Sequence, residues 1–172
     1  MPHVQSTTSE ASRKRRMCIS PRAEAQVLVD ADPKLVWEVV TDVTRQDSWS
    51  CEATSCEWLP PAESAVLGAR FRGRNRRGFR RWTRTNEVIA CEPGRTLVWI
   101  TLPTKLYPDS TEWRVELQSE SAGTVVTESY RITKLPRSLE VFLYWFNPTH
   151  RDRQGDLEQD LLRLKAFVES RR

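Results

Sequence analysis

The chain has 172 residues and a formal net charge of +4. Its length fits one domain with an N-terminal extension, and no apolar run is long enough to span a membrane as a helix. The basic excess is concentrated in residues 13–16 and 70–84, where it could attract nucleic acid or anionic lipid, although a solvated tail and strand face is the simpler interpretation.

The N-terminal residues 1–22 are polar, basic and rich in Ser and Thr. This composition predicts a disordered or loosely attached tail. The domain is therefore predicted to cover residues 23–172. It begins with a strand over residues 23–30, where apolar and polar side chains alternate.

A helix is predicted directly after this strand. Asp32 suits the N-cap and Pro33 suits the first helical position. The helical apolar stripe consists of Val36, Trp37, Val40 and Val43. Residues 42–58 are predicted to form a broken, short-helical segment that ends at two prolines.

The second half of the chain changes to strand patterns separated by turn residues. The predicted strands cover residues 68–75, 79–90, 95–102, 112–120 and 124–133. Residues 135–148 are predicted to be an apolar connector. A long helix follows over residues 151–170, with one apolar face made of Leu157, Leu161, Leu164 and Val168.

The order of these elements predicts an α+β fold. Consecutive strands joined by short turns favour an antiparallel sheet. Each strand has one apolar face that must be covered, and the last helix has a matching stripe. We therefore expect a curved antiparallel sheet wrapped around a long C-terminal helix, with two short helices after the first strand.

Several motifs in this order resemble the START-like superfamily, also called SRPBCC, and within it the polyketide cyclase/dehydrase-like group of actinobacterial type. They are the end of the first helix at residues 41–43, Trp49-Ser50, and residues 68–75, 81–83, 92–99, 123–129 and 161–165. The resemblance implies the helix-grip fold. It also implies a cavity between sheet and C-terminal helix that holds a lipid, a polyketide or another apolar small molecule.

Strand alternation predicts which side chains face such a cavity. The seven Trp residues of the chain should dominate the core or this lining. The predicted ligand-binding residues on the sheet are Phe71, Asn75, Trp82, Arg84, Asn86, Trp99, Trp113, Val115, Glu128 and Tyr130. The connector and last helix add Phe142, Trp145, Leu161 and Leu164. A mostly apolar set with a few polar groups is typical of a ligand pocket.

Two charged residues in this set, Arg84 and Glu128, are the candidate catalytic groups. An unpaired buried charge is costly, so we expect them to pair with each other, to contact one ligand, or to form an ion pair at the rim. Burial would raise the pKa of Glu128, whereas a nearby Arg would lower it. The sequence does not decide between these opposing effects.

Three functions are compatible with the sequence. The first is binding or carrying an apolar small molecule, and the second is a cyclase or dehydratase reaction on a polyketide-like substrate. The third is a nucleic-acid-associated regulatory role for outward Arg70, Arg72, Arg74 and Arg81. We do not expect nucleic acid as a partner, because no aromatic residues for base stacking lie on that face.

Other features bear on partners and compartment. The run Phe142 to Phe146 could cap the cavity, touch a membrane surface or form a homodimer contact. The four Cys and two His lack zinc-site spacing, so we expect no metal and no cofactor. No secretory signal is visible, which predicts a cytoplasmic protein whose cysteines behave as buried free thiols.

Overall fold

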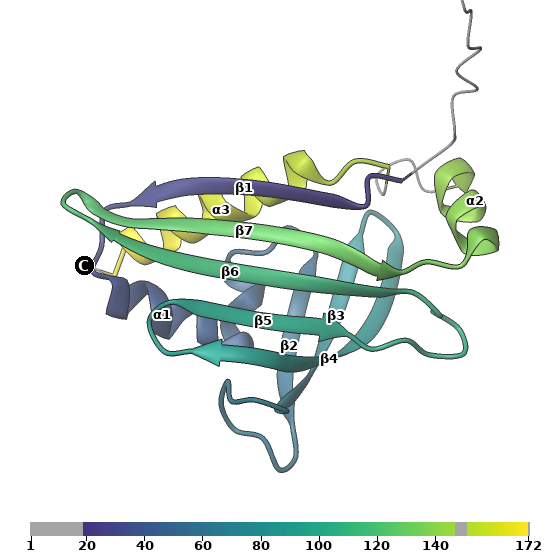
Figure 1. The fold of residues 1–172 in the computed structure, drawn as a ribbon, viewed down its shortest axis with the longest axis horizontal. Helices are drawn as coiled ribbons and strands as arrows, with labels where there is room; N and C mark the ends of the chain where they lie inside the picture. The colour runs from purple at the N-terminus through teal and green to yellow at the C-terminus, as the bar shows by residue number, and fades with distance from the viewer. Residues whose placement is uncertain (1–18, 147–150, 172) are drawn as a thin grey trace, which may run out of the picture.

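The computed structural model describes residues 19–146 and 151–171. Seven strands form one antiparallel sheet in the order β1-β7-β6-β5-β4-β3-β2 (Figure 1). They are β1 Arg22–Val29, β2 Ala53–Leu59, β3 Arg70–Arg77, β4 Arg80–Glu92, β5 Thr96–Thr101, β6 Ser110–Glu120 and β7 Gly123–Lys134. The edge strands β1 and β2 do not pair with each other within the described residues, so the sheet is curved without closing into a barrel.

The helices are α1 Pro33–Thr41, the 3-10 helix η1 Val43–Ser48, α2 Arg137–Phe146 and α3 Gln154–Glu169. Figure 1 shows α3 running along one face of the sheet, behind β1 and β7, with α1 and α2 at opposite ends of the sheet. This arrangement confirms the predicted α+β helix-grip fold, including two short helices after the first strand.

The start of α1 follows from its capping residues. The Asp32 carboxylate accepts a hydrogen bond from the Lys34 N–H at 2.8 Å, and Pro33 occupies the first turn. Asp42 is the N-cap of η1 in the same way: its carboxylate accepts a hydrogen bond from the Thr44 N–H. It also forms an ion pair with Arg45 at 3.0 Å. These caps satisfy backbone N–H groups that a helix leaves open at its start.

The core lies between α3, α1 and the inner face of the sheet. The buried side chains of α3 include the predicted stripe of Leu157, Leu161, Leu164 and Val168. They join the buried valines of α1 and residues such as Val126 of β7 in one cluster. Trp49 also belongs to this cluster and is 3% exposed.

An ion-pair network fixes the start of α3 to the far strands of the sheet. Arg77 of β3 donates two hydrogen bonds to Asp156 of α3, at 2.6 and 2.7 Å, and one to Glu52 at 2.9 Å. Arg153 donates to the other Glu52 oxygen at 2.5 Å. Because Glu52 is buried, two guanidinium groups offset the cost of keeping its charge.

Two segments differ from the sequence-based expectation. Residues 53–59 form strand β2, whereas we predicted a short-helical segment up to residue 58. A register shift between Ala53 and Ser55 interrupts the alternation that would have identified the strand. The segment predicted to be a connector contains helix α2. Its helical period could not be recognised in the sequence because residues 141–146 are all apolar.

The N-terminal boundary of the domain also differs. We placed residues 19–22 in the tail, but Ile19 is 6% exposed and the Ser20 N–H donates to the Arg151 carbonyl at 2.9 Å. The backbone of Pro21 pairs with β7. The ordered domain therefore includes these residues, while the rest of the predicted tail lies outside the described residues.

Candidate functional site

A cavity of about 160 Å³ lies between the inner face of the sheet and α3. Nine of the predicted ligand-binding residues line it: Phe71, Asn75, Trp82, Arg84, Asn86, Trp99, Trp113, Glu128 and Tyr130. Side-chain alternation along β3, β4, β5, β6 and β7 brings them to the same side of the sheet.

Five predicted residues lie elsewhere. Val115, Leu161 and Leu164 are buried in the core but are not among the cavity-lining residues. Phe142 and Trp145 of α2 are 53% and 59% exposed, and Leu143 is the α2 residue that lines the cavity. Placing Phe142 and Trp145 at the site was wrong, since the helical turn of α2 carries them to the side facing solvent.

The sheet side of the cavity is an aromatic wall. Trp99 and Trp113 are cross-strand neighbours whose rings stack at 6.4 Å with an interplanar angle of 9°. Phe71 meets Trp99 edge-on at 6.3 Å, and Tyr130 lies 5.5 Å from Trp113. Such a row of rings gives an apolar surface that a ring-containing ligand can contact.

Arg84 is held by Asp109 and does not pair with Glu128. Its Nη1 donates to both Asp109 carboxylate oxygens at 3.0 and 2.9 Å, and its Nη2 donates to the Asp109 carbonyl at 2.9 Å. The ring of Tyr107 lies 5.4 Å from the guanidinium carbon. Arg84 therefore forms an ion pair within the protein, and its partner is Asp109, which we did not predict.

Glu128 of β7 is a buried carboxyl of the cavity that is not fully hydrogen-bonded. It is 3% exposed, and its Oε2 atom has no hydrogen-bond partner among the residues that the structure describes. The pKa of Glu128 is raised to about 8, mostly by burial and in smaller part by the nearby charge of Asp160, while Arg153 acts in the opposite direction. Desolvation therefore prevails over the nearby Arg, and the carboxyl is largely protonated at neutral pH.

Asp160 of α3 brings a second carboxyl to the same cavity. It accepts a hydrogen bond from the Cys51 N–H at 2.5 Å. Burial raises its pKa to about 6, while the hydrogen bonds from Cys51 limit the rise. Asp160 lies within the apolar stripe of α3, between Leu157 and Leu161. A carboxylate at such a position is a signal that could have marked it as a site residue.

Gly73 is a glycine among the residues that line the cavity, so it has no side chain to fill the space. It lies in β3, and a Cβ atom there would sit 3.5 Å from Cys56 Sγ and 3.8 Å from Asn86 Nδ2, which are ordinary contacts. Asn86 itself accepts a hydrogen bond from the Thr101 hydroxyl at 2.9 Å. A glycine inside a strand often marks a close approach of another group, and here it leaves room in the cavity.

Other residues that strand alternation did not predict also line the cavity. They are Ile19, Gln46, Ser50, Glu52, Ala53, Cys56, Asp109, Thr111, Leu135 and Arg153. They come from η1, from loops and from the starts or ends of elements. Their positions depend on how distant segments meet, which no local pattern reports.

The described cysteines are protonated thiols. Burial raises the pKa of Cys56 to about 12, and burial together with Asp160 raises that of Cys51 still further. The thiolate is the reactive form, so these groups are poor nucleophiles at neutral pH. Cys18, His3 and His150 lie outside the described residues.

The outward arginines of β3 are partly neutralised. Arg70 pairs with Glu87 at 2.7 Å, and Arg72 and Arg74 pair with Glu57 at 3.4 and 3.6 Å. These pairs weaken the basic stripe that would attract a polyanion. The expectation that nucleic acid is not a partner stays a prediction.

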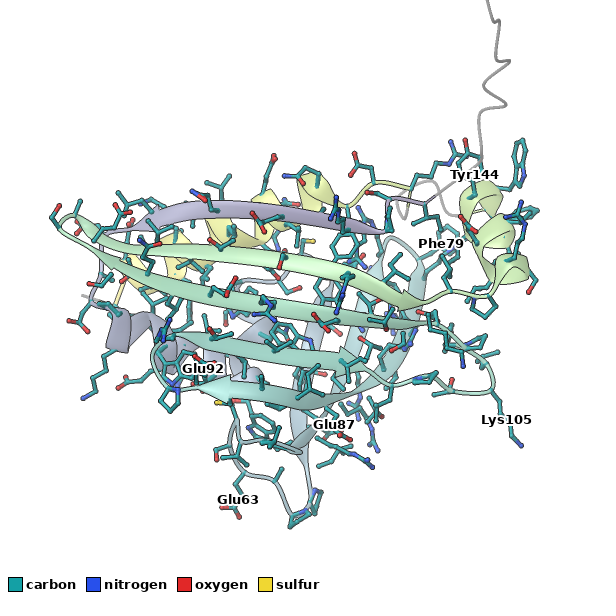
Figure 2. All side chains as sticks on the ribbon, viewed as in Figure 1. Glu63, Phe79, Glu87, Glu92, Lys105 and Tyr144 are labelled. Atoms are coloured by element: carbon teal, nitrogen blue, oxygen red, sulfur yellow. The ribbon has the colours of Figure 1, made fainter. Side chains whose placement is uncertain are left out.

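Helix α2 lies beside the tip of the β3–β4 hairpin. Figure 2 shows Phe79, which is 91% exposed, on the same side of the molecule as Tyr144 of α2. Arg80 of the hairpin donates to the Phe146 carbonyl at 2.8 Å. The homodimer contact suggested for residues 135–148 stays a prediction, and residues 147–148 lie outside the described residues.

The fold and cavity can now be compared with known proteins. A family model described as polyketide cyclase/dehydrase and lipid transport matches residues 20–169. The chain belongs to this family. The matched residues run from just before β1 to the end of α3, so the match includes every helix and strand of the described structure. Membership supports binding of hydrophobic ligands in general terms.

Solved structures agree on the fold of this family member. A polyketide cyclase-like protein of Corynebacterium glutamicum has 27% identity and a TM-score of 0.60, with 88% of this chain and 93% of that chain covered. The major latex-like protein 151 of Panax ginseng has 14% identity and a TM-score of 0.63, with coverage of 87% and 95%. DynU16, encoded in the dynemicin biosynthetic locus, has 18% identity and a TM-score of 0.58, with coverage of 89% and 49%.

Two further comparisons gave negative results. No curated protein matches this chain. Among the residues that the structure describes, no helix is both long enough and apolar enough to cross a membrane.

Proposed function

We propose that this protein binds an apolar small molecule, polyketide-like or lipid-like, in the cavity between the sheet and α3. The observation that carries the proposal is the cavity itself, with an aromatic wall on the sheet and a few polar groups, including Glu128 and Arg84, placed around it. Apolar walls with a small number of oriented polar groups characterise ligand pockets. Family membership adds support for a hydrophobic ligand.

The volume favours a compact ligand. The cavity of about 160 Å³ is smaller than the roughly 300–1,000 Å³ of pockets for drug-sized ligands. An apolar cavity of about 150 Å³ is known to hold a benzene molecule. In this conformation the site fits a ligand about the size of one substituted ring, and a long-chain lipid would require α2 or the β5–β6 loop to move.

A second candidate is a cyclase-like or dehydratase-like reaction on such a ligand. The observation that favours it is Glu128, whose buried and unpartnered carboxyl is protonated at neutral pH and can act as a general acid. Arg84 is less suited to proton transfer, because it stays charged and is held by Asp109. Its role would be to position a polar group of the substrate.

Native mass spectrometry of protein purified without denaturant from the organism that makes it tests the binding function. We expect a copurified apolar small molecule on the wild type and on Gly73→Ala, whose added Cβ makes only ordinary contacts. Gly73→Leu should fill the cavity and lose the molecule. Gly73→Val is a smaller plug for the case that the leucine variant does not fold, and circular dichroism confirms folding of each.

The outcomes separate the two candidate functions. A ligand-free wild type, or a folded Gly73→Leu variant that keeps the ligand, would contradict binding in this cavity. A ligand on Glu128→Gln that is heavier by one water than the ligand on the wild type would favour a dehydratase. The same mass on both proteins would favour a carrier over a dehydratase.

A further inference from the structure

The cavity contains more carboxyl groups than cations. Its charged lining residues are Glu52, Arg84, Asp109, Glu128, Arg153 and Asp160. Each arginine already pairs with a carboxylate through a terminal nitrogen: Arg84 Nη1 donates to both Asp109 oxygens, and Arg153 holds Glu52 at 2.5 Å, while the buried Nε of each has no hydrogen-bond partner among the described residues. Glu128 and Asp160 are left without a cation bound to them among the described residues.

The two remaining carboxyls differ in how they are satisfied. Asp160 accepts the Cys51 N–H at 2.5 Å, so part of its hydrogen-bonding capacity is used inside the protein. Glu128 lines the cavity and is only 3% exposed. Its Oε2 atom has no hydrogen-bond partner within the described part of the chain. A buried polar group without a partner costs about 1–3 kcal/mol, which a ligand that donates a hydrogen bond there would recover.

We infer that the cavity binds a small aromatic amine in its protonated form, with the ammonium group against Glu128 and Asp160 and the ring against the wall of Trp99 and Trp113. This inference rests on the proposed function and names the chemical class of its ligand. An ammonium group supplies three donors and one positive charge, which match two carboxyls that lack a cation. The aromatic faces also attract a nearby cation.

The same arrangement selects against ligands with a carboxylate. A carboxylic acid ligand would bring another negative charge beside Asp160, which is mostly ionised at neutral pH because its pKa is about 6, and like charges in a buried site repel. Arg84 and Arg153 already pair with Asp109 and Glu52, which reduces the positive charge available to receive it. A free fatty acid is therefore a poor ligand for this cavity despite its apolar chain.

Proton release accompanies binding in this scheme. The groups facing Glu128 are Asp160 and Arg153 of the α3 region, with Tyr130 beside it on β7 and Glu52 beyond Arg153. Because the pKa of Glu128 is about 8, the carboxyl carries a proton at neutral pH. An ammonium group beside it favours the carboxylate, so the proton passes from Glu128 to the buffer and an ion pair forms.

Isothermal titration calorimetry with three matched probes tests this inference. Phenylethylamine, phenylethanol and phenylacetate share a ring and differ in one polar group, which is cationic, neutral or anionic. On the wild type near neutral pH we expect the amine to bind at least about tenfold more tightly than the alcohol, a difference of about 1.4 kcal/mol, and the carboxylate to bind most weakly. Titration in two buffers of different ionisation enthalpy should show close to one proton released for the amine and none for the alcohol.

Variants assign the effect to the carboxyl group. Glu128→Gln should remove most of the amine preference and the proton release. The control is Glu120→Gln, which alters an exposed carboxyl of β6 and should behave as the wild type. Equal affinities for amine and alcohol, or an amine preference that survives in Glu128→Gln, would overturn the inference while leaving cavity binding intact. A failure of all three probes to bind would count against both the inference and the proposed function. A copurified apolar ligand without an amine would then keep the proposed function and overturn the inference.

Discussion

Raising the pH from about 5.5 to about 8 is expected to lower the free energy of unfolding by about 3 kcal/mol through Glu128 alone. The pKa of this buried carboxyl is about 8 in the folded protein, against about 4.3 in an unfolded chain. Between these values the folded state binds more protons than the unfolded state. Stability is therefore greatest below the unfolded pKa and falls by about 1.4 kcal/mol per pH unit until the folded pKa is passed.

Glu128→Gln should remove this dependence. The glutamine has nearly the shape of a protonated carboxyl, so it should cost about 1 kcal/mol or less near pH 5.5 and stabilise the protein by about 2–3 kcal/mol near pH 8. Asp160, with a pKa of about 6, contributes in the same direction at the acidic end of the range. Urea denaturation followed by tryptophan fluorescence at several pH values measures the slope.

The pH range is chosen to isolate this carboxyl. Stopping near pH 8 limits the contribution of cysteines, which titrate near about 8.5 in an unfolded chain. Glu120→Gln on β6 is the exposed control and should keep the slope of the wild type. If the wild type and Glu128→Gln had the same slope, or if wild-type stability rose with pH over this range, Glu128 would not be a desolvated carboxyl.

The second large effect concerns two adjacent leucines of α3. Leu161 is 2% exposed and lies in the core, whereas Leu162 is 61% exposed. Leu161→Ala should cost about 2–5 kcal/mol, because it removes buried methyl groups and leaves a void. Leu162→Ala should change stability by no more than about 0.5 kcal/mol.

This pair also checks the division between core and cavity. Thermal or chemical unfolding gives the two free energies, and calorimetry with phenylethanol gives the affinity. Since Leu161 is not a cavity-lining residue, the folded fraction of Leu161→Ala should bind with wild-type affinity within about threefold. Equal stability costs for the two leucines would mean that α3 does not pack as described.

The fold could be predicted from the sequence where local patterns agree with tertiary pairing. Asp32-Pro33 fixes the start of α1, and the spacing of Leu157, Leu161, Leu164 and Val168 fixes the buried face of α3. β2 could not be predicted in this way, because only its pairing with β3, across a register shift at Ala53, makes it a strand. α2 was hidden because its second half, residues 141–146, is an unbroken apolar run.

The candidate site could be predicted in part for the same reason. Alternation along the strands places Trp99, Trp113 and Glu128 on the inner face, so their position in the cavity follows from local sequence. The partners of the charged groups do not follow from it. Arg84 finds Asp109 in the β5–β6 loop, 25 residues away, and Asp160 reaches the cavity from a helix across the sheet. Which charges are paired therefore depends on contacts between distant segments.

The titration of the Glu128 side chain, followed by NMR of its labelled carboxyl carbon, tests the central claim most directly. That claim is that an unpartnered, desolvated carboxyl faces the ligand in the cavity. We predict a midpoint near pH 8 in the free protein, which moves down by about two units or more when phenylethylamine is added. A midpoint near the ordinary value of about 4.3 in the free protein, unchanged by the amine, would contradict it.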